Sequence, residues 1–225
     1  MVDADKYSRT IEDYLSLIYV IERDGEPVIG ARLAEYLQVS PPTVTNTLKR
    51  MVRDGLITME ENGTHLTEAG WKAARRIMRK HMLTEWMMAP MLPWSKLHSE
   101  AHNLEHAISA EAENALYEEL DRPQTCPHGN PMPGSEKAVA AWVPLIDVPA
   151  GKQVVIRRVH ELAEENVDLL LFLEGKGILV GEKVTVIEFL PFNQTLTIDH
   201  KGSSVVLGFA VASRIFVESA ENDAV

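Results

Sequence analysis

The stretch GARLAEYLQVSPPTVTNTLKRMVRDGLITMEENGTHL, residues 30–66, decides the fold of the N-terminal part of the chain. Its first eight residues, 30–37, predict a short helix, and the next two predict a turn. Ser40 is expected to cap a second helix, because Pro41 and Pro42 fit only a first helical turn, where backbone N–H groups have no partner anyway. The expected buried face of this second helix is apolar and consists of Val44, Leu48, Met51 and Val52. The stretch therefore predicts a helix, a tight turn and a second helix.

A hairpin is expected directly after the second helix. Residues 56–59 and 64–66 flank the sequence Glu60-Glu61-Asn62-Gly63, and Asn-Gly is a strong hairpin-turn signal. A further helix is expected before the stretch, from about Ser8 to Arg23. Its apolar face consists of Ile11, Tyr14, Leu15 and Ile18. A helix, a helix-turn-helix and a hairpin in this order predict a winged helix-turn-helix, a fold that binds double-stranded DNA.

The second helix of this fold carries a basic stripe, although the whole chain has a net charge of −11. Residues 1–80 hold 12 basic and 12 acidic side chains, whereas residues 81–225 hold 10 and 21, so the acidity belongs to the C-terminal part. Asn46 suits a base edge and Pro42 suits a thymine methyl group. Phosphates are expected at Thr43, Lys49 and Arg50. Ser40 completes the set expected to contact double-stranded DNA, and Thr47 is expected on the same exposed face.

Four side chains with metal-binding atoms share one helical stripe in the sequence HSEAHNLEH, residues 98–106. At about 100° per residue, they fall within an arc of roughly 100°. They are His98, His102, Glu105 and His106. His81 and Glu85 have the same i, i+4 relation in the preceding helix. Cys126 is the single cysteine, so a metal is expected to be held by nitrogen and oxygen. The alternative is a solvated polar helix face.

Helices are expected over residues 67–88 and 96–120. A dense apolar group between residues 82 and 92 fits either core packing or a dimer interface, and we favour the interface. The prolines and glycines of residues 122–149 predict a linker or a draped segment, with His128 as a loop residue.

The remainder of the chain predicts a small barrel of short strands. One helical insert is expected at residues 163–174. The expected strands are Val154–Val159, Lys183–Phe189, Thr195–Asp199, Val205–Phe209 and Arg214–Val217.

With these parts in place, the chain resembles the diphtheria-toxin-repressor family of metal-dependent transcriptional regulators over nearly its whole length. Six motifs carry the resemblance: Glu12-Asp13-Tyr14-Leu15, Ser40-Pro41-Pro42-Thr43-Val44, Arg53-Asp54-Gly55-Leu56, Met78-Arg79-Lys80-His81, Glu100-Ala101-His102-Asn103-Leu104-Glu105-His106 and Gly129-Asn130-Pro131-Met132-Pro133-Gly134. The resemblance implies an α+β, multidomain homodimer. Its expected parts are a winged helix-turn-helix at residues 1–72, a helical dimerisation and metal-binding domain at 73–134, a linker at 135–150 and an SH3-like (FeoA-like) barrel at 151–225.

Residue by residue, the resemblance implies two metal sites. The primary site consists of Asp13, His102, Glu105 and His106. The ancillary site contains His81, Glu85 and His98. In full-length relatives the barrel can lend further ancillary ligands, and counting back from Val180-Gly181 places these at Glu165 and Asp168. Their spacing would put both carboxylates on one helical face, but a solvated acidic helix start is an equally good interpretation.

The chain departs from the family pattern at two positions. His102 stands where iron-responsive members commonly have Cys and manganese-responsive members have Glu. Ser16 stands where the manganese-responsive branch has a carboxylate, whereas Asp13 agrees with that branch. Two carboxylates and two imidazoles without sulfur favour manganese(II) or iron(II) as cofactor, with manganese slightly ahead. Zinc, cobalt, cadmium or nickel are expected to bind in vitro, because intrinsic affinity follows the Irving–Williams order.

The resemblance also implies a mechanism in which a bound cation fixes the arrangement of two DNA-binding heads, since Asp13 belongs to the first helix and the other primary ligands to the dimerisation domain. One alternative is a DNA-binding regulator whose metal is structural and always bound. Another is a metallohydrolase, which requires an open coordination position and a general base. The sequence supplies no separate base, so we expect neither an enzyme nor a small organic substrate.

The expected location is the cytoplasm, without a membrane partner. No stretch approaches the length of a membrane span, and the start, Met1–Lys6, lacks the basic-then-apolar order of a signal peptide.

Overall fold

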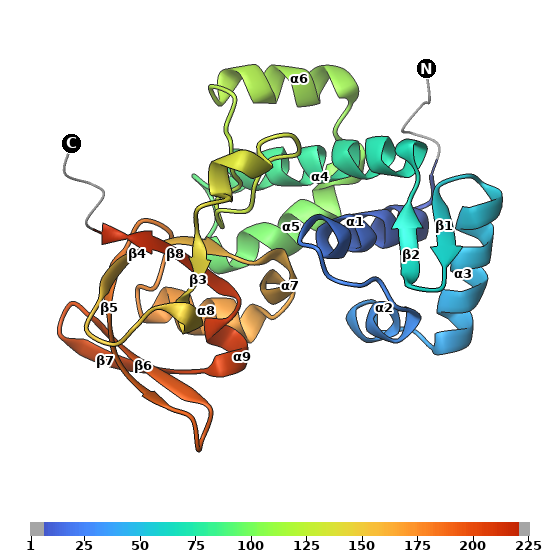
Figure 1. The fold of residues 1–225 in the computed structure, drawn as a ribbon. Helices are drawn as coiled ribbons and strands as arrows, with labels where there is room; N and C mark the ends of the chain where they lie inside the picture. The colour runs from blue at the N-terminus through green and yellow to red at the C-terminus, as the bar shows by residue number, and fades with distance from the viewer. Residues whose placement is uncertain (1–6, 221–225) are drawn as a thin grey trace. The chain divides into compact units, whose positions relative to one another are not determined.

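The computed structural model describes residues 7–220, which belong to two compact units that divide between Lys80 and His81 (Figure 1). The expectation about Met1–Lys6 lies outside the described residues, as do the outermost residues of the two terminal domains predicted above.

The first unit is the predicted winged helix-turn-helix. Its elements are α1 (Arg9–Arg23), α2 (Gly30–Tyr36), α3 (Pro41–Arg53), β1 (Ile57–Glu60), β2 (Gly63–Leu66) and the beginning of α4 (Glu68–Met88). Ser40 caps α3 as predicted, because its Oγ accepts a hydrogen bond from the Thr43 backbone N–H at 3.4 Å. Apolar side chains of the helices and the hairpin form the core: Ile11, Tyr14, Leu15, Ile18, Leu33, Val44, Leu48, Met51, Leu56, Ile57 and Leu66.

Two positions of α3 differ from the prediction. Val52, expected in the buried face, is 42% exposed, whereas Thr47, expected to face outward, is only 9% exposed. The buried stripe is centred between Val44 and Met51, so Thr47 falls inside it and Val52 at its margin.

The hairpin turn is shorter than predicted. Glu60 pairs with Gly63, which leaves Glu61 and Asn62 as the two turn residues. Gly63 has a φ of 141°, and a Cβ at this position would lie 2.9 Å from the Val28 carbonyl oxygen. Glycine is therefore needed where the hairpin approaches the segment before α2.

The second unit begins within α4 and continues through short helices. The helical region expected over residues 96–120 is confirmed, but it is interrupted: the chain forms η2 (Trp94–Lys96), α5 (Leu97–Leu104), η3 (Glu105–Ala107) and α6 (Ala110–Glu119). The break has a local cause: Ile108 is extended, and the Ser109 Oγ caps α6 by accepting a hydrogen bond from the Ala112 N–H at 3.2 Å. The predicted metal-binding stripe consequently spans two elements.

The apolar group between residues 82 and 92 divides between core and surface. Met82, Leu83 and Met88 are buried, whereas Met91 is 69% exposed. Core packing accounts for the buried side chains, and the dimer interface remains a prediction for the exposed part.

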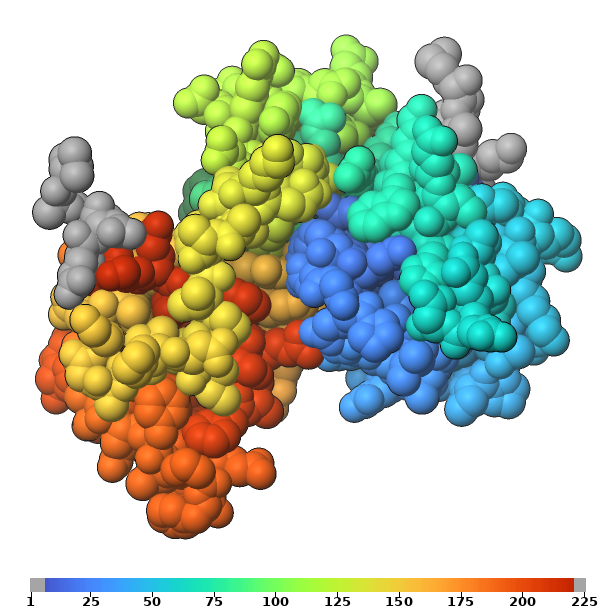
Figure 2. All heavy atoms as spheres, viewed as in Figure 1, coloured from blue at the N-terminus to red at the C-terminus, as the bar shows by residue number. Residues whose placement is uncertain are grey.

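The proline-rich segment before the barrel is packed rather than extended away from it. It contains η4 (Glu136–Val139), β3 (Val143–Pro144) and η5 (Leu145–Asp147), and β3 pairs with the last strand, β8. The Val159 N–H donates to the His128 carbonyl at 2.8 Å, and residues 128–132 are buried. Figure 2 shows the yellow part of this segment lying directly on the orange and red barrel.

The barrel is an antiparallel sheet with strand order β3-β8-β4-β5-β6-β7. Its elements after η5 are β4 (Gln153–Val159), α7 (Glu161–Glu164), α8 (Val167–Gly175), β5 (Lys183–Leu190), β6 (Thr195–His200), β7 (Ser203–Gly208), α9 (Phe209–Ala212) and β8 (Ile215–Ser219). The five predicted strands are confirmed, and β3 escaped prediction because two residues give no alternation. The helical insert consists of two helices, so Glu165 and Asp168 do not lie on one helix as predicted.

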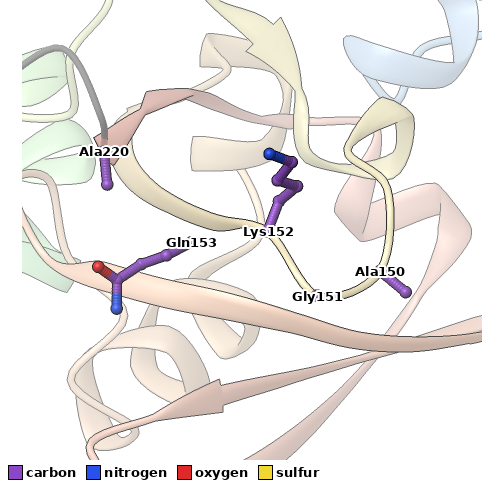
Figure 3. A pocket seen from close by; sticks show the side chains of 5 residues that line it. All are labelled: Ala150, Gly151, Lys152, Gln153 and Ala220. Atoms are coloured by element: carbon purple, nitrogen blue, oxygen red, sulfur yellow. The ribbon is translucent and has the colours of Figure 1, made fainter.

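A shallow hollow of about 400 Å³ lies at the beginning of β4 (Figure 3). It is lined by Ala150, Gly151, Lys152, Gln153 and Ala220. Lys152 is the one titratable side chain among these five, and no predicted metal ligand is among them. This hollow therefore does not provide the combination of metal and general base that the hydrolase alternative needs.

Candidate functional site

His81, on α4, lies at the centre of a buried cluster of ligand atoms in the second unit. Its Nδ1 is 2.6 Å from Glu105 Oε2, and its Nε2 is 3.0 Å from His98 Nδ1 and 3.2 Å from Glu85 Oε1. The helical spacing of α4 places Glu85 beside it, while α5 and η3 supply His98 and Glu105. The two imidazole nitrogens thus face two different groups of metal-binding atoms.

His98 connects α4 with the barrel side of the second unit. Its Nδ1 lies 3.4 Å from Glu85 Oε1 and 2.8 Å from Glu164 Oε2, and its Nε2 lies 3.3 Å from Glu165 Oε1. Glu164 ends α7 and is buried, whereas Glu165 follows it and is exposed. Carboxylates from two distant parts of the sequence therefore face one imidazole.

Glu85 directs its second oxygen at the proline-rich segment. Its Oε2 is 3.5 Å from the Nδ1 of the fully buried His128, and Cys126 completes a group whose ligand atoms all lie within 4.8 Å of one another. His128 Nε2 lies 3.1 Å from the Trp94 carbonyl oxygen, to which it can only donate. A neutral His128 would consequently direct a lone pair from Nδ1 toward a carboxylate, an arrangement that calls for a proton or a cation between them.

Glu105 lies between the two histidines at the C-terminal end of the predicted stripe, His102 and His106. Its Oε1 lies 3.7 Å from both His102 Nδ1 and His106 Nε2. Because α5 ends at Leu104 and η3 follows, His98 belongs to the group around Glu85, whereas His102 and His106 lie beside Glu105. The structure brings together His102, Glu105 and His106 as predicted, and places His81 beside them.

The cluster favours charged histidines in the absence of another cation. Burial alone would lower the pKa of His81, but hydrogen bonds to Glu105 and Glu85 raise it to about 9. Burial likewise opposes the charged form of His98, yet Glu164 and Glu165 hold its pKa well above the usual value. Although burial would raise the pKa of Glu85, the neighbouring His128 and His81 hold it well below its ordinary range. A divalent cation would compete with these protons.

The donor set fits a divalent metal ion. Among the buried side-chain atoms of residues 7–220, Glu85 Oε2 and His128 Nδ1 make no hydrogen bond. Burial of polar atoms without partners is costly, and an ion between these two atoms would satisfy both. Imidazole, carboxylate and thiol donors suit first-row transition metals better than magnesium or calcium.

The outer face of α3 in the first unit carries the predicted DNA-contacting residues. All six are exposed: Ser40, Pro42, Thr43, Asn46, Lys49 and Arg50. Ser40 Oγ and Thr43 Oγ1 lie 2.8 Å apart at the N-terminus of the helix, and Arg50 Nη2 reaches Ser8 Oγ at 3.5 Å. A helix with a packed inner face and a polar outer face has the form needed to enter a major groove.

Comparison with known families divides the chain into three parts. Residues 6–64 match the iron dependent repressor N-terminal DNA binding domain, residues 67–134 match the iron dependent repressor metal binding and dimerisation domain, and residues 143–219 match the FeoA domain. The chain belongs to the iron-dependent repressor family. It is a metal-dependent transcriptional regulator of the α+β class with a helical N-terminal domain and an SH3-like C-terminal domain.

Relatives in the iron-dependent repressor family match over most of their length. The iron-dependent repressor IdeR of Mycobacterium leprae is 35% identical over 219 residues, which cover 88% of this chain and 95% of the relative. The diphtheria toxin repressor of Corynebacterium glutamicum is 34% identical, with coverages of 94% and 97%. A solved manganese-dependent transcriptional repressor in complex with manganese has a TM-score of 0.81 at 26% identity, with coverages of 93% and 99%.

The family resemblance implies two further ligands, Asp13 and Asp168. Asp13 lies on α1 in the first unit and is partly buried. Asp168 is exposed in the first turn of α8 and belongs to none of the groups of potential ligands found among the described residues. Glu165 alone of the two predicted barrel carboxylates approaches a predicted ligand, His98.

Three residues of the cluster were missed by sequence analysis: Cys126, His128 and Glu164. His128 does lie in a loop, as expected, but it is fully buried against Glu85. The Cys-Pro-His spacing was a usable signal, because alternate residues of an extended segment can approach one ion. Glu164 was passed over in favour of its neighbour Glu165, and only the end of α7 decides which of the two faces inward.

No helix within residues 7–220 is long and apolar enough to cross a membrane.

Proposed function

We propose that this member of the iron-dependent repressor family binds operator DNA as a homodimer when a divalent cation occupies its helical domain. The observation that carries this proposal is the cluster centred on His81, where five imidazoles and four carboxylates of the described residues converge. Its position supports a regulatory role, because all members except Glu164 and Glu165 lie in the part of the chain that matches a metal-binding and dimerisation domain.

The proposed primary site consists of His102, Glu105 and His106, with Asp13 as the ligand that the family resemblance adds from α1. Glu105 supports this assignment because its Oε1 is equally distant from the two histidines while its Oε2 faces His81. His102 is the half-exposed member, so it can approach an ion without displacing a packed neighbour.

The proposed ancillary site consists of His81, Glu85, His98 and Glu165, to which the contacts of the cluster add Glu164, His128 and Cys126. Glu85 supports this extension, since one of its oxygens faces His81 and His98 while the other faces His128. Asp168 is retained as a proposed ligand on the resemblance alone.

We propose manganese(II) or iron(II) as the physiological activator. The primary donor set has no sulfur, and relatives are named for iron or manganese dependence. Zinc and cadmium are bound in solved structures of the similar protein ScaR, whose TM-scores are 0.78 and 0.80. These ions bind nitrogen and oxygen donors strongly, so in vitro binding alone does not identify the physiological metal.

On the DNA side, the two α3 helices of a homodimer are proposed to enter successive major grooves, with Asn46 at a base edge and Pro42 near a thymine methyl group. Thr43, Lys49 and Arg50 are proposed to contact phosphates, and Ser40 to contact DNA while capping the helix.

The experiment that tests the metal assignment is operator binding at buffered free metal concentrations, with wild-type protein and His102→Cys. Manganese(II) or iron(II) should activate the wild type at cellular free concentrations, and a thiolate at position 102 should shift the preference toward softer ions. Activation of the wild type by zinc at cellular levels, combined with failure of both manganese and iron, would transfer the assignment to zinc.

A further inference from the structure

A series of buried hydrogen bonds connects strand β4 of the barrel with the carboxylate of Glu164. Arg158, on β4, is buried, and its guanidinium lies 4.8 Å from the centre of the Phe216 ring. Its Nη2 donates to Glu161 Oε2 at 3.0 Å, and its Nε donates to the side-chain oxygen of Asn130.

The arginine fixes the orientation of the Asn130 amide. An arginine N–H can only donate, so the atom that faces Arg158 must be the amide oxygen. The amide nitrogen then points the other way, where it donates to the Val159 carbonyl at 2.7 Å and to Glu164 Oε1. Asn130 is fully buried, so water does not offer it a substitute partner.

Glu164 in turn faces the metal-binding cluster. With Oε1 held by Asn130, its Oε2 lies 2.8 Å from His98 Nδ1, and Oε1 itself is 3.8 Å from His128 Nδ1. A hydrogen bond from a neutral amide adds no charge to the site and restricts the rotation of the carboxylate. Partners of this kind, one step removed from a metal, orient its ligands and tune its affinity.

We propose that Arg158 and Asn130 are positioning residues, through which the barrel presents Glu164 to the cation bound by the ancillary cluster. This inference rests on the proposed function, because it assumes that Glu164 and His98 face a bound cation. On this inference, Arg158 of the barrel strand β4 affects metal affinity through Asn130 and Glu164, although it does not itself face the cation.

The test is a cobalt(II) titration of the full chain, read by competition with a chelating dye and by visible absorption of the bound ion. All variants carry His102→Ala, which removes an exposed primary ligand so that the titration reports the ancillary cluster. Asn130→Ala should weaken cobalt affinity about tenfold to a hundredfold, the range seen for such partners. Asn193→Ala is the matched control, since Asn193 lies in the exposed β5–β6 turn and should change affinity less than about twofold.

Repeating the Asn130→Ala substitution in a Glu164→Gln variant distinguishes a positioning role of Asn130 from a general loss of stability. In Glu164→Gln protein the added Asn130→Ala change should cost less than about threefold, because residues that act through one another are not additive. Arg158→Met should weaken affinity like Asn130→Ala, and Arg158→Lys should recover most of it, since an ammonium can still donate to the amide oxygen.

Equal losses from Asn130→Ala in both backgrounds, or no loss in folded protein, would overturn the inference. Urea unfolding of the metal-free variants shows which are folded, and the Arg158 pair provides the same comparison if Asn130→Ala is unfolded. His98→Ala tests the ancillary metal site separately from the positioning role of Arg158 and Asn130. If this variant leaves cobalt binding unchanged, the proposed ancillary site itself is wrong.

Discussion

His81 is the residue at which protons and a metal ion compete most directly. Its pKa of about 9 in the folded chain lies above the ordinary value of 6.5. A raised pKa contributes stability to the metal-free protein that is fully present below pH 6.5 and is lost as the pH rises through about 9. A metal ion binds only the deprotonated imidazole, so metal affinity should change in the opposite direction and increase over the same range.

Proton release measures this competition. At pH 7, binding of a divalent ion to the ancillary cluster should release about one proton for each of His81 and His98 that it engages, because both carry raised pKa values. Calorimetric titration in buffers with different ionisation enthalpies gives the number directly. A binding heat that does not depend on the buffer would show that these imidazoles are neutral before the metal arrives.

Asn46 and Arg50 should have separable effects on DNA binding. Asn46→Ala should relax base preference by about 1–3 kcal/mol at one position, since an asparagine can make a bidentate contact to adenine. Arg50→Ala should weaken binding to all sequences and reduce the salt dependence by about one counterion. Anisotropy titrations on operator and scrambled DNA over a range of salt concentrations distinguish the two. If both variants lose specific and non-specific affinity alike, the assignment of roles on α3 is wrong.

At the residue scale, the sequence predicted contacts within a helix better than contacts between distant segments. The spacing of His81 and Glu85 predicted their contact because a helix connects them. His128 lies in a proline-rich loop, where no periodicity relates a residue to distant partners, and its burial depends on contacts with Trp94 and Glu85. Thr47 shows that packing is also difficult to predict on a helix. Its polar side chain suggested an exposed position, but the packing of α3 buries it.

At the scale of elements, the segment before the barrel depends on Gly129. Its φ is 86°, and a Cβ there would lie 1.9 Å from the Arg157 carbonyl oxygen, whereas Gly134 has a φ of 97° and open space around it. Gly134→Ala should therefore cost only the backbone strain of about 1–2 kcal/mol. Gly129→Ala should cost clearly more, since β4 must also move.

Urea unfolding of the two metal-free alanine variants provides the comparison. Gly129→Ala should also weaken cobalt binding, because the segment that carries His128 is held against β4. Equal losses of stability for both variants would show that the close approach to Arg157 is not tight in solution.

The helix break before α6 shows why element boundaries were the weaker part of the sequence prediction. Residues 96–120 contain no proline or glycine, so the pattern predicted a helical region and did not locate the break within it. Ser109 was the available signal, as serine is a preferred helix cap, but a serine within an otherwise helical pattern is ambiguous. The winged helix and the barrel strands were predicted well, since turn residues and alternation mark them locally.

At the scale of the whole molecule, the chain combines a DNA-binding domain, a metal-binding and dimerisation domain and a FeoA domain. Regulation by population shift requires that the cation bind one arrangement of these parts more tightly than others. By linkage, DNA and metal must then strengthen each other's binding by the same factor. A structural, always-bound metal would instead give no response to free metal in the physiological range.

Operator affinity with and without metal therefore tests the central claim most directly. Fluorescence anisotropy with the whole 225-residue chain should show at least a tenfold gain in affinity, or about 1.4 kcal/mol of coupling, when manganese(II) or iron(II) replaces chelator. Glu105→Gln should lose most of this gain, while Asn193→Ala should retain it. Equal operator affinity of the wild type in chelator and in saturating metal would contradict metal-gated DNA binding.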